Sequence, residues 1–99
     1  MAEFRYVKLS DEEVSNGLEG VPGWAVEDGQ LTKMFAFPSY LAGVDFAANV
    51  GRAAETLNHH PDILITWRKV RIAVNTHDVG GISPYDFELA RRVDQLASE

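Results

Sequence analysis

The sequence contains no cysteine, which excludes disulfide bonds, thiolate metal sites and a cysteine nucleophile. Basic residues are also scarce, because nine Lys and Arg stand against fifteen Asp and Glu, and the formal net charge is −6. A protein that binds nucleic acid backbones normally carries a basic stripe, and here no basic run is longer than two residues. No apolar run approaches the length of a membrane span, and no apolar signal core follows Met1. We therefore expect a cytoplasmic protein that binds neither nucleic acid nor membranes.

What is present fits one small globular domain. The 99 residues leave no room for a second core, so we expect a single domain over residues 1–99. A hydrophobic fraction of 45% with 24% charged residues is ordinary for a soluble protein. A core of this size is modest, and association with further copies of the chain would add stability.

Two hairpins are predicted from alternating apolar residues and the turns between them. Asp28-Gly29 tolerates the positive φ angles of a type I′ turn, and it separates residues 24–27 from residues 30–37. The second hairpin is expected to turn at Arg68-Lys69. Its strands carry β-branched and aromatic side chains in alternation: Ile63, Ile65 and Trp67 on the first strand, and Val70, Ile72 and Val74 on the second.

Three helices are predicted from capping residues and helical spacing. Ser10 and Glu13 form a capping box, Ser39 caps a long helix that reaches about Leu57, and Ser83 opens the last helix. The long helix has small residues that admit close packing, either by a second copy in a dimer or tetramer or by the protein's own sheet: Gly43, Ala47, Ala48, Gly51 and Ala54. The order αββαββα predicts an α+β fold, a four-stranded antiparallel sheet with three helices packed on one face.

All three histidines lie where a predicted helix or strand ends. His59 and His60 follow the long helix directly before Pro61, and His77 follows the last strand. Loops on one side of a sheet can converge, and imidazole has an unperturbed pKa close to neutrality, so such a cluster suits proton transfer. The same residues also fit structural roles, such as a cation at a helix C-terminus. No acidic or thiol ligand completes a metal site, so we expect no metal.

The spacing around these histidines resembles the signature of the pterin-4a-carbinolamine dehydratases. Glu55 is followed after three residues by His59-His60-Pro61, then after five by Trp67, after nine by His77, and later by Asp86. Flanking segments agree as well, so that the resemblance spans about residues 9–97: they include Gly23-Trp24, Phe35-Ala36-Phe37 and Thr76-His77-Asp78-Val79-Gly80-Gly81-Ile82.

The resemblance implies a hydro-lyase that converts 4a-hydroxytetrahydropterin, such as 4a-hydroxytetrahydrobiopterin, to quinonoid dihydropterin and water in tetrahydrobiopterin recycling. His59 and His77 would be the main acid and base, and His60 would line the pterin pocket. The chemistry is proton transfer alone, so no cofactor is expected. The resemblance also implies a homodimer or homotetramer. An aromatic amino acid hydroxylase would be the pathway partner that supplies the pterin.

Supporting residues follow from the same comparison. Glu55 lies one helical turn before His59 and would orient that imidazole, although a solvated carboxylate is the alternative. Asp86 is expected near the pocket, although its place after Ser83 also makes it a natural acceptor for a helix-cap amide. Asn58 stands where some relatives carry Asp, so it would hold an imidazole without a charge. The remaining candidates are expected at or beside the pterin: Pro61, Asp78, Trp24 and Trp67, the two tryptophans having core packing as their alternative.

A non-catalytic role on the same fold stays open as the alternative function. Animal relatives also act as dimerization cofactors for a transcription factor, and some bacterial relatives serve as assembly factors for a carbon-fixing enzyme. The presence of all three histidines favours catalysis, because a scaffold does not need them. Since the histidines lie at element ends, we expect folding to survive the replacement of each one.

Overall fold

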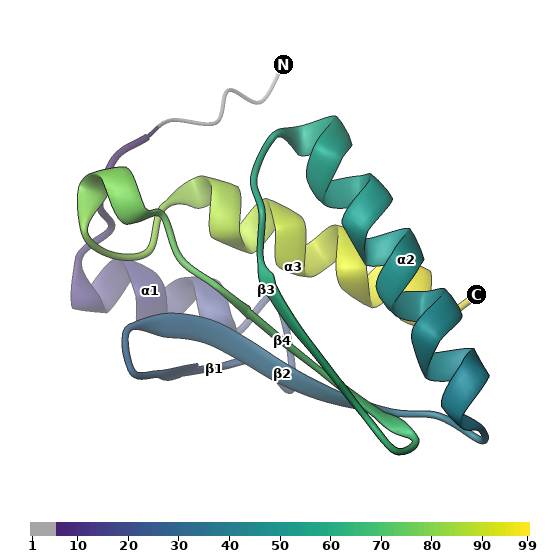
Figure 1. Cartoon of the computed structure of the whole chain (residues 1–99). Helices are drawn as coiled ribbons and strands as arrows, with labels where there is room; N and C mark the ends of the chain where they lie inside the picture. Colours follow the sequence, from purple (N-terminus) through teal and green to yellow (C-terminus); the bar gives the residue numbers. More distant parts are fainter. Residues whose placement is uncertain (1–5) are drawn as a thin grey trace.

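The computed structural model describes residues 6–99 and places three helices over one face of a four-stranded antiparallel sheet (Figure 1). The helices and strands are α1 (Asp11–Leu18), β1 (Ala25–Glu27), β2 (Gln30–Ala36), α2 (Tyr40–Leu57), β3 (Asp62–Thr66), β4 (Lys69–Val74), the 3₁₀ turn η1 (His77–Val79) and α3 (Pro84–Ala97). The strand order in the sheet is β1-β2-β4-β3. The predicted fold class and element order are confirmed.

Two-residue turns close both hairpins, but the second turn differs from the prediction. Asp28 and Gly29 have φ angles of 51° and 76°, as a type I′ turn requires. In the second hairpin Thr66 pairs with Lys69, so the turn consists of Trp67 and Arg68 rather than Arg68-Lys69. The predicted and observed registers differ by two residues. Because side chains alternate with a period of two, both registers turn the same apolar residues inward, and the alternation alone cannot distinguish them.

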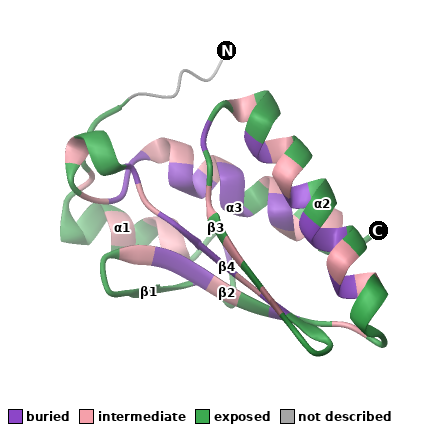
Figure 2. Cartoon of the chain, viewed as in Figure 1, coloured by how far each residue is buried: buried purple, intermediate pink, exposed green. Residues whose placement is uncertain are grey.

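The core lies between the helices and the two central strands, as Figure 2 shows. The outer surface of α2 is largely exposed, whereas its inner face contributes Phe46, Val50 and Ala54 to the core. α3 buries Phe87, Ala90 and Val93, while Ala97 is exposed. Within residues 6–99, no helix has the length and hydropathy that crossing a membrane would require.

The small residues of α2 divide between two faces. Gly43, Ala47 and Ala54 are buried, and a Cβ atom at Gly43 would lie 3.3 Å from Val70 Cγ2 on the sheet. Ala48 is exposed, and a Cβ atom at Gly51 would meet nothing within 4 Å. Close packing on the protein's own sheet therefore explains Gly43, burial in the core explains Ala47 and Ala54, and the other two face outward.

Candidate functional site

The three histidines line one cleft, with a volume of about 360 Å³, at the end of the sheet where α2 stops and β4 leaves it. Asn58 caps α2 in the left-handed conformation, with a φ of 55°. This conformation ends the helix and turns the chain directly before His59 and His60. A bridge between Thr76 and Gly81 closes the loop that contains η1 and His77. The cleft is lined by Tyr6, Asn58, His59, His60, Asn75, Thr76, His77 and Asp78.

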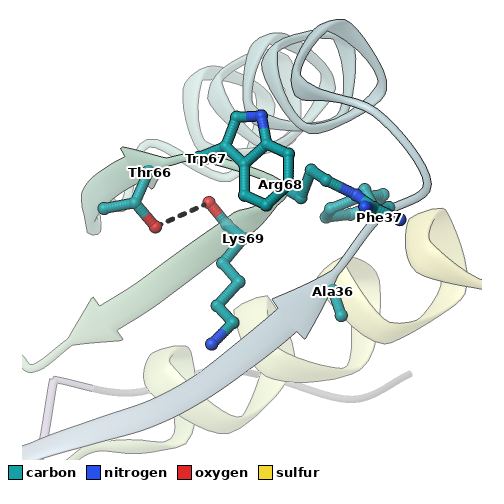
Figure 3. A pocket seen from close by; sticks show the side chains of 6 residues that line it. All are labelled: Ala36, Phe37, Thr66, Trp67, Arg68 and Lys69. Atoms are coloured by element: carbon teal, nitrogen blue, oxygen red, sulfur yellow. Dashed lines mark hydrogen bonds between the residues drawn. The ribbon is translucent and has the colours of Figure 1, made fainter.

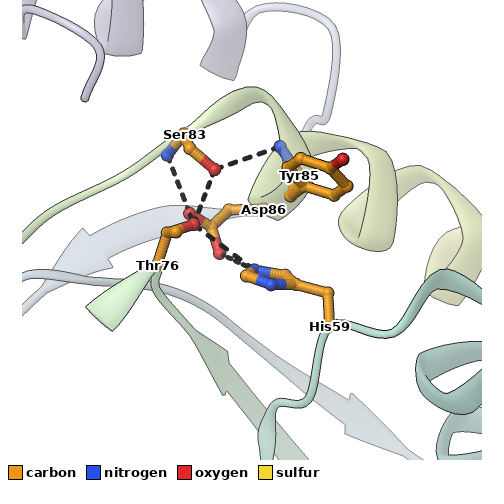
Figure 4. A network of polar contacts seen from close by, with 5 residues as sticks. All are labelled: His59, Thr76, Ser83, Tyr85 and Asp86. Carbon is orange, nitrogen blue, oxygen red and sulfur yellow. Dashed lines mark hydrogen bonds and ion pairs between the residues drawn. The ribbon is translucent and has the colours of Figure 1, made fainter. Parts of the chain in front are cut away.

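His59 is held by a buried carboxylate from a distant part of the chain. Its Nε2 lies 2.6 Å from Oδ1 of Asp86, and the two residues are only 7% and 0% exposed (Figure 4). The other carboxylate oxygen, Oδ2, accepts hydrogen bonds from the Ser83 amide and from Thr76 Oγ1, each at 2.8 Å. Asp86 is thus both the predicted acceptor of the helix-cap amide and the partner of a histidine in the cleft.

With Asp86 ionised and His59 neutral, the donors and acceptors in this network have one consistent arrangement. An ionised carboxylate only accepts hydrogen bonds, so His59 Nε2 carries a proton and the neutral imidazole keeps its free lone pair on Nδ1. Thr76 Oγ1 donates to Asp86, and Ser83 Oγ, 2.6 Å from Thr76 Oγ1, therefore donates to Thr76 while it accepts from the Tyr85 amide. Among the described residues no buried side-chain nitrogen or oxygen lacks a hydrogen-bond partner. In that protonation state the partners of His59 Nε2 determine the tautomer of the ring.

His60 has a different partner, at the surface. Its Nε2 pairs with Oε2 of Glu55, and the two side chains are 54% and 77% exposed. The expectation that Glu55 orients His59 is therefore wrong. The reversal of the chain at Asn58 turns His59 inward toward α3, and the neighbouring His60 turns outward over the last turn of α2. Ion pairs as exposed as this one contribute about 0–1 kcal/mol, so the pair positions the ring more than it stabilises the fold.

The two tryptophans do not reach the cleft. Trp24 is buried in the core, where its Nε1 donates to Asp94 at 2.9 Å and its ring packs edge-on against Phe35. Trp67 is 72% exposed at the turn between β3 and β4, where Arg68 lies over its ring (Figure 3). The five residues of β3 separate this turn from His60, a length of about 16 Å at about 3.3 Å per residue. Trp24 thus takes the core-packing alternative, Trp67 takes neither expected place, and neither ring lines the histidine cleft.

Asn58 and Asp78 do line the cleft, whereas Pro61 lies beside it, half-buried, at the start of β3. A second cavity, of about 530 Å³, surrounds Trp67 at the opposite end of the hairpin and holds none of the histidines (Figure 3). Its lining is mainly apolar, and of the described residues that form it only Arg68 and Lys69 are ionisable. Proton-transfer chemistry therefore points to the smaller cleft.

Residues 7–96 match the family model described as pterin 4 alpha carbinolamine dehydratase. The chain belongs to this family. A Roseiflexus sp. (strain RS-1) protein, named provisionally as a pterin-4-alpha-carbinolamine dehydratase, is 40% identical over 90% of this chain and 96% of its own length. The resemblance inferred from the histidine spacing is thereby confirmed at the level of the family.

Two solved structures of this dehydratase fold are similar to the chain. The crystal structure of a transcriptional coactivator/pterin dehydratase from Brucella melitensis has a TM-score of 0.85 and 28% identity, covering 91% of this chain and 98% of that one. A pterin dehydratase-like protein identified as a RuBisCO assembly factor in the alpha-carboxysome has a TM-score of 0.62 and 27% identity, covering 77% and 88%. The fold of this family therefore occurs with more than one named role.

Several residues that line or support the cleft were not identified as site residues from the sequence. Thr76 was noted only as the neighbour of His77, and Ser83 only as a helix cap, although both contact Asp86. Asn75 and Tyr6 carried no signal at all, and both line the cleft. The position of Thr76 next to His77 was the one signal in the sequence that could have indicated its role. Its hydrogen bond to Asp86 joins residues ten apart, of which only Asp86 lies in α3, so local sequence does not reveal it.

The burial of His59 corrects one further expectation. Removing its side chain would leave Oδ1 of Asp86 buried without its imidazole partner, and an unpaired buried carboxylate is strongly destabilising. His60 and His77 are exposed, so their replacement costs little burial. Of the three histidines, His59 is thus the one whose side chain contributes to the fold as well as to the cleft.

Proposed function

We propose that this chain is a 4a-hydroxytetrahydropterin dehydratase that works by histidine acid–base catalysis. The observation that supports this most is the gathering of three imidazoles on one cleft, two of them paired with carboxylates. Imidazole can donate and accept protons near neutral pH, which the loss of water from a carbinolamine requires. Membership of the pterin dehydratase family supports the same substrate.

The geometry supports separate roles for two of the histidines. His59 donates through Nε2 to Asp86, so its Nδ1 lone pair is the basic site left to remove a proton from a ring nitrogen of the pterin. His77, in protonated form, gives a proton to the 4a-hydroxyl. The C4a–O bond breaks, water leaves, and the electron pair of the deprotonated nitrogen forms the new C=N bond of quinonoid dihydropterin. His60, held by Glu55 at the rim, assists by lining the pocket.

The test is the dehydration of freshly generated 4a-hydroxytetrahydropterin, followed spectroscopically and corrected for the uncatalysed reaction. Wild-type protein should accelerate the reaction, and His77→Ala should lower kcat by roughly 10²-fold or more, the usual contribution of one acid–base group. Gln95→Ala, at an exposed position of α3, serves as the control and should keep full activity. Chelators should leave the rate unchanged, because the proposed steps use only imidazole and carboxylate groups. A wild-type protein that gives no acceleration would disprove the proposal.

We also propose that the chain forms a homodimer or homotetramer through the outer face of α2. Leu41, Val44, Ala48 and Gly51 recur at helical spacing on this face, and Leu41 is 68% exposed. A stripe of small and apolar residues allows a second helix to approach closely, and burying Leu41 removes apolar surface from water.

A protein-binding role is the second candidate, and the similarity to the RuBisCO assembly factor supports it. Such a role needs an exposed apolar surface but not the histidine cleft. A wild-type protein without dehydratase activity that still binds a partner protein after replacement of His77 would favour this candidate over the enzyme.

A further inference from the structure

Among the described residues, Tyr6 is the one that lines the histidine cleft from outside the segment that matches the family model, which begins at residue 7. Its ring stacks on the ring of Tyr85, with centroids 4.3 Å apart and an interplanar angle of 18°. Tyr85 in turn lies 5.7 Å from the ring of His59. Three rings, from the N-terminal segment, α3 and the end of α2, are thus packed in sequence beside the cleft.

Specific contacts place Tyr6 there. The Leu9 amide donates to the Ile82 carbonyl oxygen at 2.8 Å, so residues 6–9 run alongside the loop that follows η1. Lys8 packs against this loop so closely that a Cβ atom at Gly81 would lie 2.9 Å from Lys8 Cε. On the other side, Tyr85 belongs to the capped first turn of α3, where its amide donates to Ser83 Oγ. The stack therefore rests on the same turn that holds Asp86.

The composition of the cleft shows what Tyr6 can contribute. The other lining residues described are polar and suit hydrogen bonds to the edge of a ligand: Asn58, His59, His60, Asn75, Thr76, His77 and Asp78. Tyr6 supplies the only benzene ring among them and is 50% exposed, so one part of its surface is covered by Tyr85 and another is open. A bicyclic ligand such as a pterin needs such an apolar surface for its face as well as polar groups for its edge.

We propose that Tyr6 is a substrate-positioning residue, whose ring, supported by Tyr85, packs against one face of the bicyclic pterin and selects bicyclic over smaller substrates. This inference rests on the proposed dehydratase function. It adds to that function a residue that the family match does not include. Since stacking holds substrate and transition state alike, its loss raises KM and leaves kcat nearly unchanged.

The experiment compares Tyr6→Ala with Tyr6→Phe and with a matched control, Tyr40→Ala. Tyr40 is 49% exposed, almost the same as Tyr6, but lies at the start of α2 and does not line the cleft. Tyr6→Ala should raise KM, and the Kd for a stable 7,8-dihydropterin, between about 2-fold and about 12-fold, the range expected for one aromatic pair. Tyr6→Phe should stay near wild type because the ring is kept, and Tyr40→Ala should match wild type. Melting temperatures of all variants separate lost binding from lost folding.

The outcomes separate this inference from the proposed function. If wild type is active but Tyr6→Ala has an unchanged KM and Kd, the positioning role is wrong and the dehydratase proposal stands. If wild type is inactive yet binds the dihydropterin in a Tyr6-dependent way, the dehydratase proposal is wrong and the stacking site stands. Wild-type protein that neither reacts with nor binds a pterin overturns both. Equal losses in Tyr6→Ala and Tyr6→Phe would assign the effect to the hydroxyl group and overturn the stacking argument.

Discussion

Replacing Asp86 by Ala should destabilise the fold more than any surface change, because Asp86 is fully buried and accepts three hydrogen bonds. The Ser83 amide, the Thr76 hydroxyl and His59 Nε2 would each lose an acceptor. An unsatisfied buried donor costs about 1–3 kcal/mol, so the free energy of unfolding should fall by at least about 3 kcal/mol. For a domain of this size that is a drop of at least about 12 °C in melting temperature.

Replacing Asp86 by Asn tests the tautomer of His59 instead. The Ser83 amide can only donate, so the carbonyl oxygen of the substituted side chain should face it, and the side-chain NH₂ group should face His59. Nε2 then becomes an acceptor and the proton moves to Nδ1, which can no longer accept a proton from the pterin. We expect kcat to fall by roughly 10²- to 10⁴-fold, as when an aspartate that orients a catalytic histidine is replaced by asparagine. The loss of stability should be much smaller than in Asp86→Ala.

The assays are thermal unfolding at fixed protein concentration, dehydration rates across pH, and ¹⁵N chemical shifts of the imidazoles, which report the tautomer directly. Asp94→Asn is the matched control, because Asp94 lies on the same helix but outside the cleft. Its carboxylate accepts hydrogen bonds from Trp24 and Lys33, and the substitution removes its charge. It should lower stability without changing the pH–rate profile. An active Asp86→Asn variant with an unchanged profile would refute the role of the carboxylate, and an Asp86→Ala variant as stable as wild type would refute the energetic argument.

Three further predictions concern other parts of the chain. Trp67→Ala should leave KM for the pterin unchanged, because this ring lies at the far end of β3, and an increased KM would contradict that placement. Ala48→Arg, on the outer face of α2, should reduce the mass of the assembly measured by light scattering. Asn49→Arg, which lies off that face, should leave the mass unchanged. A wild-type protein that is monomeric would exclude the assembly. Hydrogen bonds from the backbone and side chain of Ser10 hold the pKa of Glu13 below its ordinary value of 4.5. A lowered pKa contributes stability above that value and loses it as the pH falls, so the melting temperatures of wild type and Glu13→Gln should differ at pH 7 and converge in acid.

Features that depend on a few neighbouring residues were predictable from the sequence. The caps at Ser10, Ser39 and Ser83 and the turn at Asp28-Gly29 all formed as expected, because each is a contact between residues at most three apart. Helical and strand periodicity then determined which faces are buried. The family was also predictable, because the spacing of the histidines can be read from the sequence without knowledge of the fold.

Features that join distant segments were decided only by the tertiary structure. The register of the second hairpin escaped prediction because two registers satisfy the same alternation, and Trp67 therefore moved from a strand into a turn. His59 pairs with Asp86, which lies 27 residues away in the sequence, whereas the nearer Glu55 pairs with His60. Tyr6 and Tyr85 meet because the first described residues lie against the loop that opens α3. Local sequence thus determined the helices and strands of this protein and the position of the histidines at their ends. The partner of each imidazole depended instead on which side chains the fold brought within hydrogen-bonding distance.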